Sequence, residues 1–127
     1  MSELFDINTR LEEVNARKWN LADIEARFAH LVQNGTAGKT CDPARMKRDK
    51  SAVVERVRLR AEEYCYLTRN CAKGSATALF EEFGLGNMEI VRGLAAAPGI
   101  AMSGGICGPV TGGLLALGLY FSSPDIM

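Results

Sequence analysis

The sequence predicts an all-α protein, a compact bundle of about five to six helices with a glycine-rich buried helix at its C-terminal end. Apolar residues recur mostly at intervals of three and four, which is the spacing of one helix face. No Asn-Gly pair lies between two alternating segments, as it would in a β-hairpin. The chain has 127 residues and 47% hydrophobic content, which is enough for one core, so we expect a single domain, 1–127.

Residues 1–42 are expected to form a helical hairpin and a turn. The first helix is predicted over residues 4–14 and the second over residues 21–32, ending at Asn34-Gly35, because glycine commonly follows the last residue of a helix. Turn-forming residues then dominate up to Asp42. The apolar stripe of the second helix comprises Leu21, Ile24, Phe28 and Leu31.

A helical core that carries the cysteine motif is expected over residues 43–127. It begins with a long helix from Pro43 towards Arg69, because Asp42-Pro43 combines a cap with a first-turn proline. The apolar stripe of this helix comprises Met46, Val53, Val57, Ala61, Tyr64 and Leu67. The opposite, solvent-facing side of the helix comprises Lys47, Arg48, Asp49, Lys50, Glu55, Arg56, Arg58 and Arg60. We interpret these charges as a solvated face, with a docking surface for an acidic partner as the alternative.

Three shorter helices are predicted next, over residues 72–83, 88–97 and 109–120. The first of these helices is expected to place Ala76, Leu79, Phe80 and Phe83 in the core. Asn87 is the expected N-cap of the second helix. The segment 99–121 is uncharged, but its seven glycines and its lack of basic flanks favour a loop and a buried helix over a membrane span. The small residues Gly108, Gly112, Gly113, Ala116 and Gly118 allow close approach of a neighbouring helix or of a flat cofactor.

Charge and compartment exclude several classes of partner. Fifteen basic residues balance fifteen acidic ones, so the attraction that nucleic acids and anionic membranes exploit is missing. The opening residues MSELFDINTR lack the basic end and apolar run of a secretory signal, so we expect a cytoplasmic protein. In a reducing compartment, four cysteines suggest buried thiols, metal ligands or redox groups rather than a disulfide framework.

Cys65 and Cys71 share a site only if the helix breaks between them. In a continuous helix, six residues separate their Cα atoms by about 9 Å, and a disulfide tolerates about 7 Å. A break over residues 68–70 would make Asn70 the cap of a new helix that starts at Cys71. The unpaired amides of that first turn stabilise a thiolate.

Cys107 repeats the arrangement, because it directly precedes Gly108-Pro109 at the expected start of the last helix. Thiolates at two helix starts suit thiol–disulfide exchange or a soft metal. The alternative is that these cysteines are small apolar residues buried for packing alone.

The combination of Cys65, the NCA at residues 70–72 and the segment GGICGPVTGGLLALGLYF at residues 104–121 resembles the redox-active family named for its C_GCAxxG_C_C pattern. The resemblance makes Cys65, Cys71 and Cys107 the first three cysteines of the pattern. Asn70 and Ser75 stand where the pattern has glycines. The fourth cysteine has no counterpart, and Cys41 is the one other thiol that could replace it in space.

The resemblance implies a helical protein that is an accessory to electron transfer or reductive metabolism. It also implies redox-related or metal-linked cysteines. Together with a fourth thiolate, Cys65, Cys71 and Cys107 could hold an iron–sulfur cluster or another thiolate-bound metal, and Gly108 is expected to lie beside such a cofactor. The closely spaced cysteine runs of ferredoxins are absent, and no CxxC pair or histidine partner supports zinc.

Other chemistries find less support in the sequence. His30 is the single histidine and is expected to be an ordinary residue on a helix surface. The segment GTAGKT, residues 35–40, lacks the glycine spacing and the preceding strand of a phosphate-binding loop. Adjacent acids diverge by about 100° on a helix, so the pairs Glu62-Glu63 and Glu81-Glu82 are interpreted as solvent charges.

Our leading hypothesis is a redox-active or metal-binding accessory protein in which Cys65, Cys71 and Cys107 converge. Cys71 and Cys107 are the expected redox pair, Cys65 is a third ligand or resolving thiol, and a larger oxidoreductase or electron-transfer protein is the expected partner. The alternative is a noncatalytic subunit of an oxidoreductase complex, in which the cysteines only pack. A self-sufficient enzyme ranks last, because no acid–base group accompanies the thiols. Apolar residues near both ends, including Tyr120-Phe121, suggest a homo-oligomer.

Overall fold

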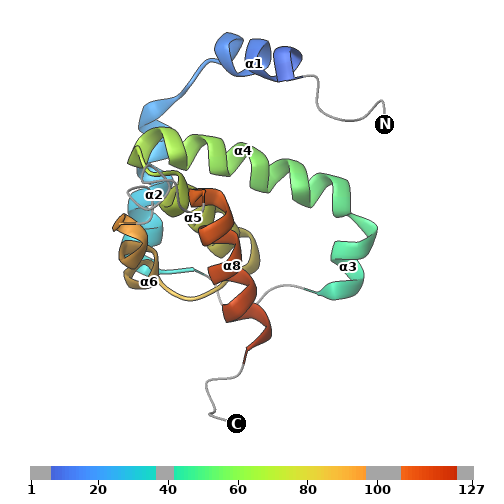
Figure 1. Ribbon diagram of the computed structural model, residues 1–127, viewed down its shortest axis with the longest axis vertical. Helices are drawn as coiled ribbons and strands as arrows, with labels where there is room; N and C mark the ends of the chain where they lie inside the picture. Colours follow the sequence, from blue (N-terminus) through green and yellow to red (C-terminus); the bar gives the residue numbers. More distant parts are fainter. Residues whose placement is uncertain (1–6, 37–41, 97–106, 123–127) are drawn as a thin grey trace.

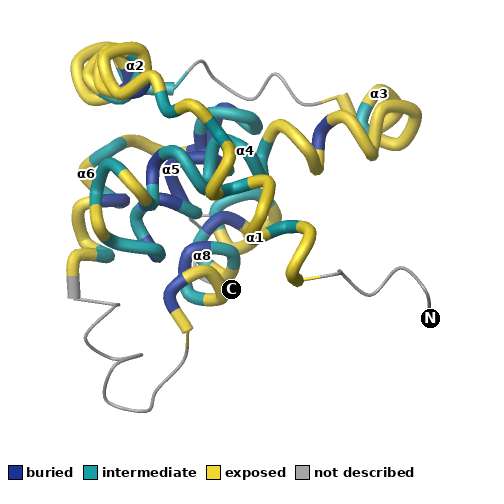
Figure 2. The backbone as a smooth tube through the Cα atoms, turned by 90° about the horizontal axis from the view of Figure 1, so that it is seen from above, coloured by how far each residue is buried: buried dark blue, intermediate teal, exposed yellow. Residues whose placement is uncertain are grey.

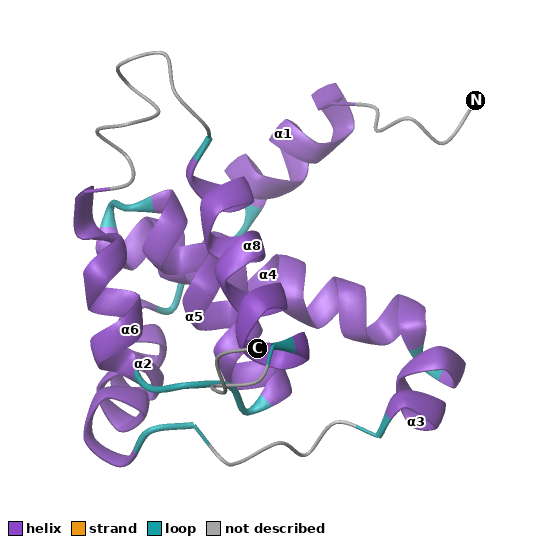
Figure 3. Ribbon diagram, turned by 60° about the horizontal axis from the view of Figure 1, so that its bottom comes forward, coloured by secondary structure: helices purple, strands orange, loops and turns teal. Residues whose placement is uncertain are grey.

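The computed structural model describes residues 7–36, 42–96 and 107–122 and is all-α over these ranges, with no strand (Figures 1 and 3). The described ranges hold seven α-helices and one 3-10 helix, slightly more than the five to six expected. The elements are α1 Ile7–Ala16, α2 Leu21–Asn34, α3 Pro43–Arg48, α4 Lys50–Thr68, α5 Cys71–Phe83, α6 Met88–Arg92, η1 Gly93–Ala96 and α8 Gly108–Phe121. The all-α prediction is confirmed.

Helix α5 is the centre of the fold, packed against α4 through one face and against α8 through another. Figure 2 shows buried positions gathered along this helix, and they are Ala72, Gly74, Ala76, Thr77, Ala78 and Phe80. Most of these residues are small, so the backbones of α4 and α8 approach α5 closely. A methyl group on Gly112 of α8 would come within 2.7 Å of the Ala72 carbonyl oxygen. Close helix packing is therefore the use of this glycine.

Two apolar clusters flank α5. One cluster joins α5 to α6 and α8 through Ala76, Phe80, Leu85, Val91 and Ala116. The other joins α2, α4 and α5 through Ile24, Leu31, Tyr64 and Ala78. The expected stripes are confirmed for their central residues, whereas Leu21 at the start of α2 is exposed.

The helix expected from Pro43 towards Arg69 is divided in two at Asp49. Asp42 caps α3 as predicted, accepting a 2.9 Å hydrogen bond from the Ala44 amide. Asp49 ends α3 and precedes α4 with φ −102° and ψ 21°, and it makes no side-chain cap hydrogen bond. Neither glycine nor proline marks this bend, so the sequence pattern contained no breaker to detect.

The first two helices do not form the expected hairpin by packing on each other. In the described residues, α2 packs on α4, and the pair of α1 with α2 is not among the extensive helix contacts. α1 reaches α4 through polar contacts, such as Arg10 with Glu55 at 3.8 Å. The position of α1 beside α4 in Figure 1 agrees with these contacts.

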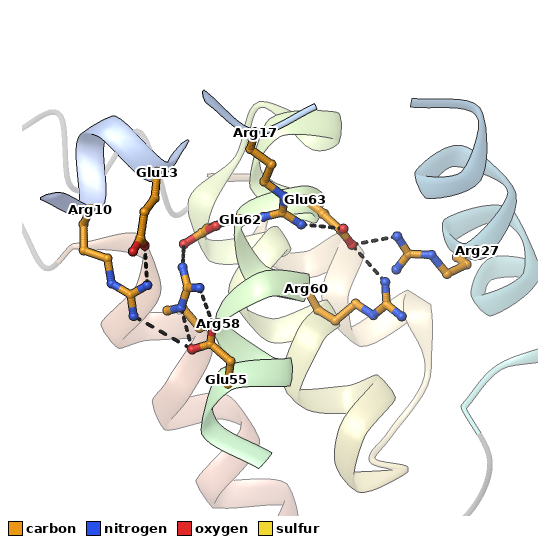
Figure 4. A network of polar contacts seen from close by, with 9 residues as sticks. All are labelled: Arg10, Glu13, Arg17, Arg27, Glu55, Arg58, Arg60, Glu62 and Glu63. Atoms are coloured by element: carbon orange, nitrogen blue, oxygen red, sulfur yellow. Dashed lines mark hydrogen bonds and ion pairs between the residues drawn. The ribbon is translucent and has the colours of Figure 1, made fainter. Parts of the chain in front are cut away.

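Arginines and glutamates form a network of ion pairs that joins α1, α2 and the segment between them to α4 (Figure 4). Glu63 accepts hydrogen bonds from Arg17 at 2.7 Å, from Arg27 at 2.6 Å and from Arg60 at 3.0 Å. Glu62 accepts from Arg17 at 2.9 Å and also pairs with Arg58. The interpretation of Glu62-Glu63 as solvent charges was therefore wrong.

The adjacent pair Glu81-Glu82 also contacts other helices. The Tyr64 hydroxyl donates a 2.7 Å hydrogen bond to Glu81, and Arg56 forms a 2.6 Å ion pair with Glu82. The sequence argument failed because long arginine side chains reach both members of an adjacent pair, although the two point in different directions. Much of the basic face of α4 is thus occupied within the molecule.

Within the described ranges, none of the helices combines the length and the apolar character required to cross a bilayer.

Candidate functional site

The predicted break between Cys65 and Cys71 is present, and three consecutive residues build it. Helix α4 ends at Thr68, Arg69 adopts the left-handed conformation with φ 53°, and Asn70 is extended with φ −142°. The Asn70 side chain accepts a 2.9 Å hydrogen bond from the Lys73 amide and so caps α5. Cys71 is therefore the first residue of α5, as the sequence predicted.

Thr68 and Asn70 also anchor the break to its surroundings. The Thr68 hydroxyl lies 2.7 Å from the Tyr64 carbonyl oxygen, and the Asn70 amide donates to this hydroxyl at 3.3 Å. The Asn70 side-chain amide donates a 3.3 Å hydrogen bond to the Ala95 carbonyl in η1. The turn is thus fixed from both the α4 side and the η1 side.

Arg69 stacks at one end of a column of cationic and aromatic side chains. Its guanidinium lies 4.8 Å from the Tyr66 ring centroid, and the Tyr66 ring stacks on Trp19 at 5.1 Å. The Arg17 guanidinium also lies over the Trp19 ring, 4.5 Å from its centroid. Cation–π contacts of this kind help to hold Arg69 in a conformation that L-residues seldom adopt.

Cys65 faces α5 from the last turns of α4 and lies directly on Gly74. A Cβ atom on Gly74 would come within 2.4 Å of the Cys65 nitrogen and 2.5 Å of its sulfur. The Cys65 thiol donates a 3.6 Å hydrogen bond to the Cys71 carbonyl oxygen. Burial raises the pKa of Cys65, although a hydrogen bond from Ser75 opposes the increase. The thiol of Cys65 is thus held in its neutral form.

Cys71 lies against the start of α8. A Cβ atom on Gly108 would come within 2.3 Å of the Cys71 sulfur. A carbon–carbon bond is about 1.5 Å long and successive Cα atoms are about 3.8 Å apart, so this sulfur lies within about 8 Å of the Cys107 Cα. Cys107 is the residue that precedes α8, as predicted, and its side chain is exposed.

The chain turns therefore bring three cysteines to one corner, where α4 ends and where α5 and α8 begin. Cys65 and Cys71 are half-buried and Cys107 is exposed, and all three are free thiols. Cys107 is thus the most accessible of the three residues. A thiol pair formed by Cys71 and Cys107 stays a prediction at this point.

Among the described residues, the structure provides no cluster of ligands for the predicted metal site. Over the ranges 7–36, 42–96 and 107–122, no group of three or more Cys, His, Asp or Glu side chains is placed to hold a metal ion. Gly108 lies against the Cys71 sulfur, and its place beside a cofactor stays a prediction. Cys41 lies outside the described residues, and His30 is an exposed residue of α2. Metal binding by Cys65, Cys71 and Cys107 stays a prediction.

Sequence reasoning missed Gly74 and Ser75 as contacts of Cys65. The available signal was the run of small residues from Ala72 to Ala78, which indicates a helix approached closely on several faces. Ser75, which stands where the family pattern has a glycine, contributes a hydrogen bond to the neighbouring thiol.

Residues 69–126 match a family described as "Putative redox-active protein (C_GCAxxG_C_C)". The matched segment contains Cys71 and Cys107 and begins shortly after Cys65. No curated protein and no solved structure matches the chain. The resemblance seen in the motif is confirmed for this segment, and the family description supports a redox role in general terms.

Proposed function

We propose that this protein, whose C-terminal segment matches the C_GCAxxG_C_C family, carries out thiol–disulfide exchange through Cys107 and Cys71. The observation that carries the proposal is the contact of the Cys71 sulfur with Gly108, the residue next to Cys107. The half-buried thiol of Cys71 thereby lies against the residue that follows the exposed Cys107. Thiol–disulfide exchange requires one accessible thiol to attack the substrate and a second thiol nearby to resolve the mixed disulfide.

The exchange has two steps. The Cys107 thiolate attacks a disulfide in the substrate, forms a mixed disulfide and releases one substrate thiolate, which takes up a proton. The Cys71 thiolate then attacks the Cys107 sulfur, forms the Cys71–Cys107 disulfide and releases the second substrate thiol. The substrate disulfide is reduced by two electrons, and the two protein thiols are oxidised by two. A dithiol reductant returns the pair to the thiol form.

Cys65 is assigned a supporting role in this scheme. Burial keeps this thiol neutral, and the thiol donates a hydrogen bond to the Cys71 carbonyl oxygen. It is therefore poorly suited to the first attack on a substrate disulfide. Its sulfur lies 3.6 Å from the Cys71 carbonyl oxygen, and its role as a later resolving thiol stays a hypothesis.

A mixed-disulfide experiment tests the proposal. Reduced protein is mixed with glutathione disulfide, quenched with acid at successive times, and mapped by mass spectrometry. In the variant Cys71→Ser, the glutathione adduct on Cys107 should accumulate and persist. In the unaltered protein the same adduct should be transient, because Cys71 resolves it.

Cys65→Ser is the matched control and should behave like the unaltered protein. A persistent Cys107 adduct in both the unaltered protein and Cys71→Ser would rule out resolution by Cys71. Thiols that all stay unmodified would favour the alternative of a noncatalytic subunit in which the cysteines only pack.

The partner we propose is a larger oxidoreductase or electron-transfer protein that presents a disulfide, in a reducing compartment such as the cytoplasm. The exposure of Cys107 at the start of α8 supports a macromolecular partner, because this residue is accessible without entry into a closed pocket.

A further inference from the structure

Helix α8 carries an exposed apolar stripe on the face opposite its contact with α5. The stripe consists of Val110, Leu114, Leu117 and Phe121, which are 51%, 58%, 55% and 77% exposed. The buried residues of the same helix, Gly108, Gly112 and Ala116, face α5. None of the four stripe residues is therefore part of the buried surface that packs α8 against α5.

The spacing of the stripe is that of a helix–helix seam. Its residues follow one another at intervals of four, three and four, which is the alternation of the two apolar positions in a coiled-coil heptad. Gly113 and Gly118 flank the seam, and a Cβ atom at either position would meet no atom within 4 Å. Their missing side chains leave room for a second helix to approach the α8 backbone closely.

We infer that the seam is covered by α8 of a second copy of this chain, related to the first by a two-fold axis. Helix α8 contains no charged residue from Gly108 to Phe121. Two copies therefore meet without like charges facing each other and without burying an unpaired charge. The seam also offers no charge by which a different charged partner would be selected.

A groove beside the seam extends the apolar surface. It has a volume of about 570 Å³, and its α8 wall consists of Gly113, Ala116, Leu117, Tyr120 and Phe121. Its other walls are apolar side chains of α3, α5 and the segment after α5, namely Pro43, Met46, Leu79, Phe83 and Leu85. A partner helix on the seam can therefore insert a side chain into this groove.

The other exposed apolar pair on a helix differs in its surroundings. Ile7 and Leu11 of α1 are also exposed, but Arg10, Glu12 and Glu13 lie among them. Pairing two copies through α1 would bring these charges together. This contrast supplies a matched control, because Leu11 and Leu117 are 54% and 55% exposed.

Light scattering on the full chain, with a phosphine reductant present to exclude disulfide-linked species, tests the inference. The unaltered protein should be a dimer at micromolar concentrations. Leu117→Glu should weaken dimerisation by more than about a hundredfold, because it places a charge in the seam of each copy. Leu11→Glu should leave the dimer intact.

Circular dichroism should show the same helix content for all three proteins, since both leucines are exposed. A monomeric unaltered protein at about 100 μM would overturn the inference. A dimer that survives Leu117→Glu, or one that Leu11→Glu dissociates, would equally overturn the placement of the interface on α8.

Discussion

The Cα of Gly108 lies against the sulfur of Cys71 so closely that a methyl group on the glycine would come within 2.3 Å of it. This contact joins the start of α8 to the start of α5 and places Cys107 beside Cys71. Glycine is required here by its lack of a side chain, not by an unusual backbone angle, because only Gly35, Gly84 and Gly86 have positive φ among the described glycines.

Gly108→Ala should therefore destabilise the fold by about 1–3 kcal/mol, because α8 must shift away from α5 to make room. The shift should also increase the rate at which Cys71 reacts with iodoacetamide. Thermal unfolding and peptide mapping measure the two effects. Gly93→Ala, away from α8, is the control, and it should raise stability by about 0.5–1 kcal/mol, because Gly93 is helical with φ −59° and a Cβ there would meet no atom within 4 Å.

The left-handed conformation of Arg69 yields a second prediction. Arg69→Ala and Arg69→Gly both lose the contact with Tyr66, but only alanine keeps the steric penalty of φ 53°. The glycine variant should be more stable than the alanine variant by about 1 kcal/mol in urea unfolding. Equal stabilities would show that Arg69 is not left-handed in solution.

Glu63 is the centre of the ion-pair network, and its side chain is 13% exposed. Glu63→Gln removes the charge that faces Arg17, Arg27 and Arg60, and it leaves the half-buried Arg27 with only the more distant Asp23, at 3.3 Å, as an anionic partner. The free energy of unfolding should fall by about 2–4 kcal/mol, measured from the urea midpoint.

The control for this network is Glu13→Gln, because Glu13 pairs with Arg10 at 2.7 Å where both side chains are well exposed. That change should alter the free energy of unfolding by less than about 0.5 kcal/mol. Equal effects of Glu13→Gln and Glu63→Gln would contradict the central place of Glu63.

Burial raises the pKa of Cys65 above its value of about 8.5 in the unfolded chain. Below that value both states hold the proton, so the contribution to stability is fully present. It is lost as the pH rises through the unfolded pKa towards the folded one, because unfolding then releases a proton. Stability of the unaltered protein should therefore fall more steeply from pH 8 to pH 10 than that of Cys65→Ala.

Tyr64, whose pKa burial also raises, adds a decline above about pH 10 in both proteins. The difference between the two proteins isolates Cys65. Parallel curves from pH 8 to pH 10 would contradict the burial of its thiol.

The sequence predicted the features that depend on local chemistry. Asp42, Asn70 and Asn87 each cap a helix where expected, because a side-chain oxygen satisfies nearby amides without help from distant residues. The start of α5 at Cys71 followed from the cap at Asn70, and α8 begins at Gly108, one residue before the start expected at Pro109.

Features that depend on tertiary contacts could not be predicted. The bend at Asp49 has no local signal, and the ion pairs of Glu63 with Arg17 and Arg27 join residues distant in sequence. The close contact between Cys65 and Gly74 also forms only when α4 packs on α5. Local patterns thus placed the helix ends, but not the surfaces that the helices share.

The most direct test of the central claim is a redox titration of the full-length reduced protein in glutathione buffers, followed by acid quenching and peptide mapping. The account predicts a peptide pair linked by Cys71 and Cys107 that appears in a two-electron transition as the buffer becomes more oxidising. Cys71 and Cys107 that end as separate glutathione adducts at every ratio, without a linked pair, would contradict it.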